Sequence, residues 1–308
     1  MNTNYITTRD PEYDKAVWDA MRFRPFDDTV FRKGKTPYGT FKLPDFSESK
    51  FIEKLNKESL FRQVATVVYN KGDHDFWARD CGDTVSWIPE GESIPIYEGI
   101  DDFTPYQIGS HKIASIVRFQ EEFVYSPGFD IEKHLTTHMA KTFARAEEYG
   151  FINGDGETQP IGILADEGGA DIGVTASELT YEHVVKLFFS VKPEYRKAGK
   201  WLMNDETAQV LRIAKDTTGN YIWNHNNDTI LGKEVMISNE MPSAGSGTKP
   251  IAFGDFSYYW IFDREHFSVK ALREKFASYG QVGYLGFEFL DGLLIRKDAV
   301  KVLSISGE

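Results

Sequence analysis

The 308-residue sequence has one cysteine, Cys81, so no disulfide can form within the chain. It has no apolar run near the roughly 20 residues needed to span a bilayer, and its opening residues, MNTNYITTRDPEYDK, are too polar for a secretory signal. These features favour a chain folded in a reducing cytoplasm. Positive charge is also scarce, and the net charge of -12 argues against a surface built mainly to grip nucleic-acid phosphates.

The sequence also lacks a catalytic or metal-binding constellation. His134 and His138 have the i, i+4 spacing of a zinc pair, but the glutamate of H-E-x-x-H is missing and no third ligand stands out. Cys81 lies in an acidic stretch, which raises a thiol pKa rather than activating the thiol. The GSG at 245–247 is not a nucleophile elbow. We therefore predict no enzymatic activity, no cofactor and no metal site.

Aromatic residues, in contrast, are abundant, with 23 Phe, 15 Tyr and 6 Trp. This exceeds the need of a minimal core and is typical of chains that bury surface against partners.

The hydrophobic patterns predict an α+β protein. Residues 1–45 read as an arm with one short helix in 10–24. A capping-box pattern at Ser49 predicts a helix start, followed by a strand at 65–69. Apolar residues at helical spacing predict a long helix over 130–153, with Asp130 as its N-cap. Further helices are expected within 178–191 and 204–216, and strands within 200–204, 234–238, 250–256, 266–276, 281–295 and 299–305.

Residues 73–112 read as a long hairpin, because TVSWIPEG and KIASIVRF alternate between polar and apolar residues and PEGES has turn chemistry. This segment is strongly acidic. Against the single base Arg79 it carries Asp75, Asp80, Asp83, Glu90, Glu92, Glu98, Asp101 and Asp102.

The stretch FINGDGETQPIGIL, residues 151–164, follows the long helix directly. It does not fit a phosphate loop, because it lies at a helix C-terminus, where the helix dipole is negative. It has too few carboxylates for an EF-hand. We therefore predict a tight hinge turn formed by Gly154, Gly156 and Pro160.

Five segments in order resemble the major capsid proteins of tailed double-stranded-DNA phages, which have the Hong Kong phage capsid fold. They are GKTPYGTFKLPDF with FIEKLNKESLFRQVATVV, WIPEGESIP, the helix ending in EYGFINGDG with QPIGIL, WLMNDETAQVLRIAKDTTGNYIW with LGKEVMISNEMP, and IAFGDFSYYWIFDRE. The resemblance runs from about residue 11 to the end of the chain.

The resemblance implies a division of the chain. An N-terminal arm (1–45) would embrace neighbouring subunits, and an extended hairpin loop (73–112) would overlie an adjacent subunit. A peripheral domain (46–72, 113–159 and 256–293) would have a spine helix at about 130–153. An axial domain (160–255 and 294–308) would pack around five-fold and six-fold centres. The hinge turn would join the two domains, with Gly154 and Gly156 at positive φ.

The resemblance further implies self-assembly as pentamers and hexamers into a virion head shell in the host cytoplasm. The shell would enclose double-stranded DNA without sequence-specific binding or membrane contact. Partners would be a portal, a scaffold and a maturation protease or decoration proteins. Because the mature-like sequence begins almost at Met1, we expect the scaffold to be a separate protein. An encapsulin-like compartment and a soluble metal hydrolase are the alternatives.

Two interactions between subunits follow from this resemblance. No lysine lies between Lys71 and Lys112, and Tyr279 aligns near the acceptor position, so we expect no covalent cross-link between subunits. We expect the hairpin instead to dock through charge on a basic cluster of its neighbour, either the strand end SVKALREK or a second cluster at 192–200. The acidic side is Asp83, Glu90, Glu92, Glu98, Asp101 and Asp102; the first basic cluster is Lys270, Arg273 and Lys275.

Overall fold

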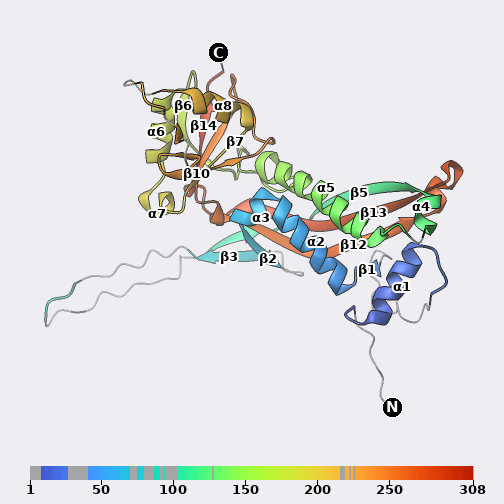
Figure 1. Ribbon diagram of the computed structural model, residues 1–308. Helices are drawn as coiled ribbons and strands as arrows, with labels where there is room; N and C mark the ends of the chain where they lie inside the picture. Colours follow the sequence, from blue (N-terminus) through green and yellow to red (C-terminus); the bar gives the residue numbers. More distant parts are fainter. Residues whose placement is uncertain are drawn as a thin grey trace.

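Helix α5 (Ile131–Asn153) lies along one face of a five-stranded sheet, with α2 (Asp45–Glu58) beside it (Figure 1). We describe the chain from a computed structural model. The described residues are 8–26, 41–69, 75–79, 87–90, 93, 103–126, 128–215, 219–221, 223–224 and 227–307. The predicted α+β class is confirmed.

The five-stranded sheet is built on two long strands, β12 (Tyr259–Leu272) and β13 (Gln281–Leu294), which pair antiparallel. β5 (His111–Gln120) extends the sheet from β13. On the other edge, β12 pairs with β1 (Phe41–Lys42) near its end and runs parallel to β2 (Thr66–Tyr69) near its start.

A second, seven-stranded sheet forms the other body of the molecule (Figure 1). Its strand order is β6-β14-β11-β7-β10-β9-β8. The strands are β6 (Asp171–Ala176), β7 (Lys200–Met203), β8 (Trp223–Asn224), β9 (Thr229–Ile230), β10 (Lys233–Ile237), β11 (Ile251–Gly254) and β14 (Val300–Ile305). The helices of this part are α6 (Tyr181–Ser190), α7 (Pro193–Arg196), α8 (Asp205–Ile213) and the 3-10 turn η3 (Phe256–Tyr258).

The remaining elements lie around the first sheet. They are α1 (Pro11–Met21), α3 (Leu60–Val64), α4 (Glu121–Tyr125), the 3-10 turn η4 (Glu274–Tyr279) and a separate antiparallel pair, β3 (Asp75–Arg79) with β4 (Phe103–Gln107).

The first core forms where α5 meets the sheet. The buried face of α5 presents Leu135, Met139 and Phe143 to the sheet and to α2. Phe51 of α2 stacks on Phe267 of β12, with ring centroids 3.8 Å apart. Helix α1 enters the same core, so the first helix of the predicted arm packs on its own chain.

A second core joins the two bodies. Phe151 and Ile152, at the end of α5, pack with Tyr259 at the start of β12 and with buried residues of the seven-stranded sheet, including Leu202. The last turn of α5 is therefore held by both sheets at once.

Two local expectations were wrong, and a third was right only in part. Ser49 does not cap a helix: α2 begins at Asp45 after Pro44, and the Ser49 hydroxyl bonds the Asp45 carbonyl within the helix. Of TVSWIPEG, residues 87–90 are described and lie outside any strand. KIASIVRF is a strand, but it is β5 of the main sheet, and the hairpin partner of β3 is β4.

Candidate functional site

The hinge turn after α5 is held together by several backbone hydrogen bonds. The N–H groups of Gly162, Ile163 and Leu164 donate to the carbonyls of Gly154, Phe151 and Ile152, so the chain folds back on the helix end. Ile161 donates its N–H to Gly292 of β13 and accepts a 2.8 Å bond from the Tyr259 hydroxyl. The turn thus ties α5 to both long strands.

Asp155 organises the exposed tip of this turn. Its carboxylate accepts backbone N–H bonds from Glu157 and Thr158, both at 2.9 Å, and from Gln159 at 3.2 Å. These donors, led by Glu157, lower the pKa of Asp155 to about 2. The carboxylate is used internally, which is consistent with a turn rather than a ligand loop.

The two glycines of the hinge act for different reasons. Gly156 has φ +78, as expected. Gly154 does not: its φ is -62, so the expectation of positive φ was wrong there. Gly154 is required by close approach instead, because a Cβ would lie 2.0 Å from the Pro160 carbonyl oxygen and 2.4 Å from that of Gly150. Pro160 is buried beside Gly150.

The root of the β3–β4 hairpin is anchored at the junction of the two bodies. Phe76 packs on Trp260 of β12, with ring centroids 4.7 Å apart, and the Tyr106 hydroxyl donates a 2.6 Å bond to the Ile295 carbonyl. Asp291 of β13 accepts from the Gly109 N–H, and Ile108 is buried beside it in the chain. These contacts hold the base of the β3–β4 pair against β12 and β13.

Most of the predicted acidic docking residues fall outside the described residues. Glu90 is described and exposed, and Trp87 in the same short described stretch is fully exposed. The others, Asp83, Glu92, Glu98, Asp101 and Asp102, are not among the described residues.

The structure brings the first basic cluster to one end of the main sheet. Lys270 lies on β12 and is exposed, and Lys275 is exposed on η4. Arg273 already pairs with Glu121 at 3.3 Å and lies over the Phe23 ring. Lys270 and Lys275 therefore remain the more accessible cations of this cluster.

The second basic cluster is largely satisfied within the chain. Lys192 pairs with Asp298 at 2.6 Å, and Lys200 pairs with Glu234 at 2.7 Å. Arg196 lies over the Phe188 and Phe189 rings. This arrangement makes 192–200 the weaker docking surface.

Sequence reasoning missed a buried ionic network beneath α5. Arg62 of α3 donates to both oxygens of Glu147 at 2.7 and 2.6 Å and to both oxygens of Asp263 at 2.9 and 2.8 Å. Glu288 of β13 is buried against Glu147, and burial raises its pKa well above the ordinary range. No sequence motif links these positions, because they come from four separate elements.

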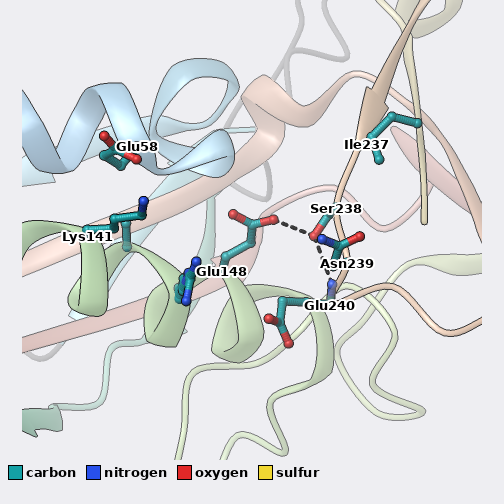
Figure 2. Close-up of a pocket in the computed structure, with 9 residues that line it drawn as sticks. Glu58, Lys141, Glu148, Ile237, Ser238, Asn239 and Glu240 are labelled. Atoms are coloured by element: carbon teal, nitrogen blue, oxygen red, sulfur yellow. Dashed lines mark hydrogen bonds between the residues drawn. The ribbon is translucent and has the colours of Figure 1, made fainter. Parts of the chain in front are cut away.

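A cleft of about 230 Å³ separates α2 and α5 from the end of β10. Figure 2 shows Glu148 and Ser238 directed toward each other across it, and the Ser238 hydroxyl donates to the Glu148 carboxylate. Glu240 donates its backbone N–H to the same hydroxyl. This polar contact links α5 to the seven-stranded sheet.

His134 and His138 lie on the exposed face of α5 with ring centroids 5.6 Å apart. Burial and the neighbouring His138 lower the pKa of His134. Within the described ranges, no group of three or more His, Cys, Asp or Glu side chains is placed to hold a metal ion. In the same part of the chain, no helix has the length and apolarity of a membrane span.

Solved structures with this architecture are phage-type shells. The capsid of an empty GTA particle matches with a TM-score of 0.67 and 27% identity, over 81% of this chain and 90% of that one. The chain of Gordonia phage Cozz matches with a TM-score of 0.57 at 12% identity, over 82% and 87% of the two chains, which shows the fold alone. The fold therefore defines a shell-forming structural subunit of the Hong Kong phage type.

The family follows from the sequence itself. The profile of the phage capsid family matches residues 39–305, and the chain belongs to this family. A curated relative, the "Probable major capsid protein gp17" of Mycobacterium phage L5, is 27% identical over 206 residues. That match covers 63% of this chain and 61% of the relative, which is less than two thirds of its length.

Proposed function

We propose that this chain is the major structural subunit of a tailed-phage head, assembling as pentamers and hexamers into an icosahedral shell around double-stranded DNA. The observation that carries the proposal is the family match over 39–305 together with a phage-shell fold over four fifths of the chain. The role is structural rather than enzymatic.

Each part then has a role. The arm, 1–45, embraces neighbours and is fixed to its own subunit by Tyr13, Val17 and Met21 of α1. The first sheet and α5 form the peripheral domain. The seven-stranded sheet forms the axial domain around the five-fold and six-fold centres. The backbone hydrogen bonds between Gly154 and Gly162 and the shared core around Phe151 support a hinge between the two domains at this turn.

The hairpin docks on the neighbour through charge, with the first basic cluster as its target. Lys270 and Lys275 support this role because both are exposed at the sheet end. Each exposed pair contributes only about 0–1 kcal/mol, but the contact repeats in every subunit. Reversing Lys270, Arg273 and Lys275 to Glu should abolish or weaken shells at low salt. Compensating Lys substitutions among the hairpin acids should restore some assembly, whereas unchanged assembly of the triple variant would exclude this surface.

The partners of the subunit would be those of a phage head: a portal protein, a scaffold protein and a maturation protease or decoration proteins, with assembly in the host cytoplasm. A related shell in the satellite phage P4 procapsid was solved with a size-determination protein, at 11% identity and a TM-score of 0.57. That likeness bears on the fold alone.

Electron microscopy of the purified, concentrated chain, alone and co-expressed with its neighbouring genes, tests the assembly. We expect hollow particles built from pentamers and hexamers. A monomer under every condition would overturn the proposal. Small shells filled with cargo protein would indicate an encapsulin-like compartment, and a zinc-bound monomer would indicate a hydrolase.

A further inference from the structure

The exposed face of α5 carries a row of basic side chains. Lys133, Lys141 and Arg145 are exposed at helical spacing, with His134 and His138 exposed between them. We call these five residues the α5 basic face. From Lys133 to Arg145 the row extends about 18 Å, at about 1.5 Å per residue.

The cations of this face are not neutralised by the helix that bears them. Two of its acidic residues pair with other cations, Glu132 with Lys50 and Glu147 with Arg62, and the third, Glu148, accepts from the Ser238 hydroxyl. Among the described residues, Lys133, Lys141 and Arg145 form no ion pair within 4.0 Å. Three carboxylates, those of Glu58, Glu148 and Glu240, line the same cleft as Lys141 and Arg145, and none of them forms an ion pair with either cation. In a chain of net charge -12, this row is a local exception.

The chemistry of the row fits phosphate better than a protein partner. A stable protein interface is centred on buried apolar anchors, and the exposed residues between Lys133 and Arg145 include none. The uncharged Thr137 and Thr142 are exposed hydroxyl residues, a side-chain type that contacts phosphate oxygens. His134, whose pKa is lowered by burial and by His138, adds a hydrogen-bonding ring nitrogen. A straight row of cations suits a duplex, which carries one charge per about 1.7 Å of its axis.

The two sides of the main sheet are also distinct. Val269 packs in the core beneath α5, so the next residue, Lys270, points to the opposite side of the sheet. The proposed hairpin-docking surface and the α5 basic face therefore lie on opposite sides of one slab.

We propose that the α5 basic face lines the inside of the shell and contacts the phosphate backbone of the enclosed double-stranded DNA. This inference rests on the proposed head-shell function. The contact is independent of base sequence, because it reads only phosphates. It also assigns the outer side of the slab to Lys270 and the neighbour's hairpin.

The test compares two variants with equal charge loss. One replaces Lys133, Lys141 and Arg145 by Gln; the control replaces the exposed Lys186, Lys215 and Lys297 by Gln. Binding of a 30-base-pair duplex to unassembled full-length subunits is followed by fluorescence anisotropy across a salt series. We expect the α5 variant to reduce the slope of log K against log salt by about 2.7, at about 0.9 per removed cation, and the control to change it little.

The same variants are examined as particles. DNA-filled wild-type particles, cross-linked with ultraviolet light, should yield nucleotide adducts within residues 133–145. Both variants should still form particles. The inference would be overturned if wild type did not bind the duplex, or if the α5 variant bound it as wild type does. Failure of only the α5 variant to assemble, or equally tight binding of a poly-glutamate competitor, would also overturn it, because both would indicate a protein contact. Absence of wild-type particles would instead overturn the head-shell function.

Discussion

At the residue scale, Arg62 is the side chain that we expect to matter most for the stability of the subunit. Its side chain is 2% exposed and holds two carboxylates from two other elements. Removing one partner of a buried ion pair leaves an uncompensated charge, which is more costly than the pair itself is stabilising.

We expect Arg62→Met to lower the free energy of unfolding by about 3–5 kcal/mol, because Glu147 would stay buried without its cation. Urea denaturation of unassembled subunits measures this loss. Arg212→Met is the matched control, since Arg212 pairs with Asp228 at the surface and should change stability by less than about 1 kcal/mol. Equal effects of the two variants would contradict the role of the network.

Glu288 makes the stability of the fold depend on pH. Burial raises its pKa, so the folded chain keeps a proton that the unfolded chain releases above about pH 4.3. Because the folded state binds more protons, the stability that protonated Glu288 contributes is complete below about pH 4.3. It is lost as the pH rises toward the pKa of Glu288 in the folded state.

Glu288→Gln retains the shape of the side chain and removes this linkage. We expect the melting temperature of the variant, relative to wild type, to increase between pH 5 and pH 8. Thermal melting across this range measures the difference, with the exposed Glu53→Gln as control. A difference that does not change with pH would show that Glu288 is ionised in the folded protein.

We expect substitutions at the two hinge glycines to destabilise the fold for different physical reasons. Gly156→Ala places a β-carbon at positive φ and should cost about 1 kcal/mol, and Gly156→Val more. Gly154→Ala forces backbone against backbone and should cost more than Gly156→Ala. Gly128→Ala, which meets nothing within 4 Å, is the control. Thermal melting and particle yield report both effects; normal assembly of Gly156→Val would refute the hinge role.

At the scale of elements, the point where α2 ends sets the direction of the next helix, α3. Ser59 separates α2 from α3: its backbone is extended, and its hydroxyl accepts from the Arg62 N–H. This break turns α3 so that Arg62 reaches α5. Local capping therefore decides a long-range ion pair.

The β3–β4 pair is the base of the hairpin that we propose to dock on a neighbouring subunit. Tyr106→Phe removes the hydroxyl that bonds the Ile295 carbonyl and should weaken the hairpin root by about 1 kcal/mol. We expect faster hydrogen exchange at 103–107, measured by mass spectrometry, with exchange in α5 unchanged. Tyr221→Phe, an exposed tyrosine in the other body, serves as control. Unchanged exchange in β4 would mean that Phe76 and Ile108 suffice to hold the root.

At the scale of the whole molecule, Lys270 and the α5 basic face lie on opposite sides of the main sheet. Residues 73–111 contain no lysine, so this part of the hairpin segment cannot supply the amine of an isopeptide bond.

We therefore expect mature particles, boiled in detergent, to run as a single band near 35.1 kDa on a gel. Unassembled subunits loaded beside them give the reference position. A ladder of higher oligomers would show that another amine forms the cross-link.

The sequence alone determined the elements with strong periodicity and the family. The apolar spacing in 131–153 predicted α5 and its Asp130 cap, because a single helix face buries itself by local rules. The capsid fold was indicated by the resemblance of five ordered segments to phage capsid proteins, because the patterns alone indicated only a protein of mixed helices and strands. The turn at Gly156 was predicted because turn chemistry is local in sequence.

The tertiary structure decided what depends on distant partners. Gly154 is needed because Pro160 approaches it, and Arg62 contacts Glu147 and Asp263 only after α3, α5 and β12 pack together. β5 pairs with β13 rather than within the hairpin because register across a sheet is set by long-range burial. The placement of Lys270 and the α5 basic face on opposite sides also depends on tertiary structure, because the sheet that separates them exists only in the folded chain.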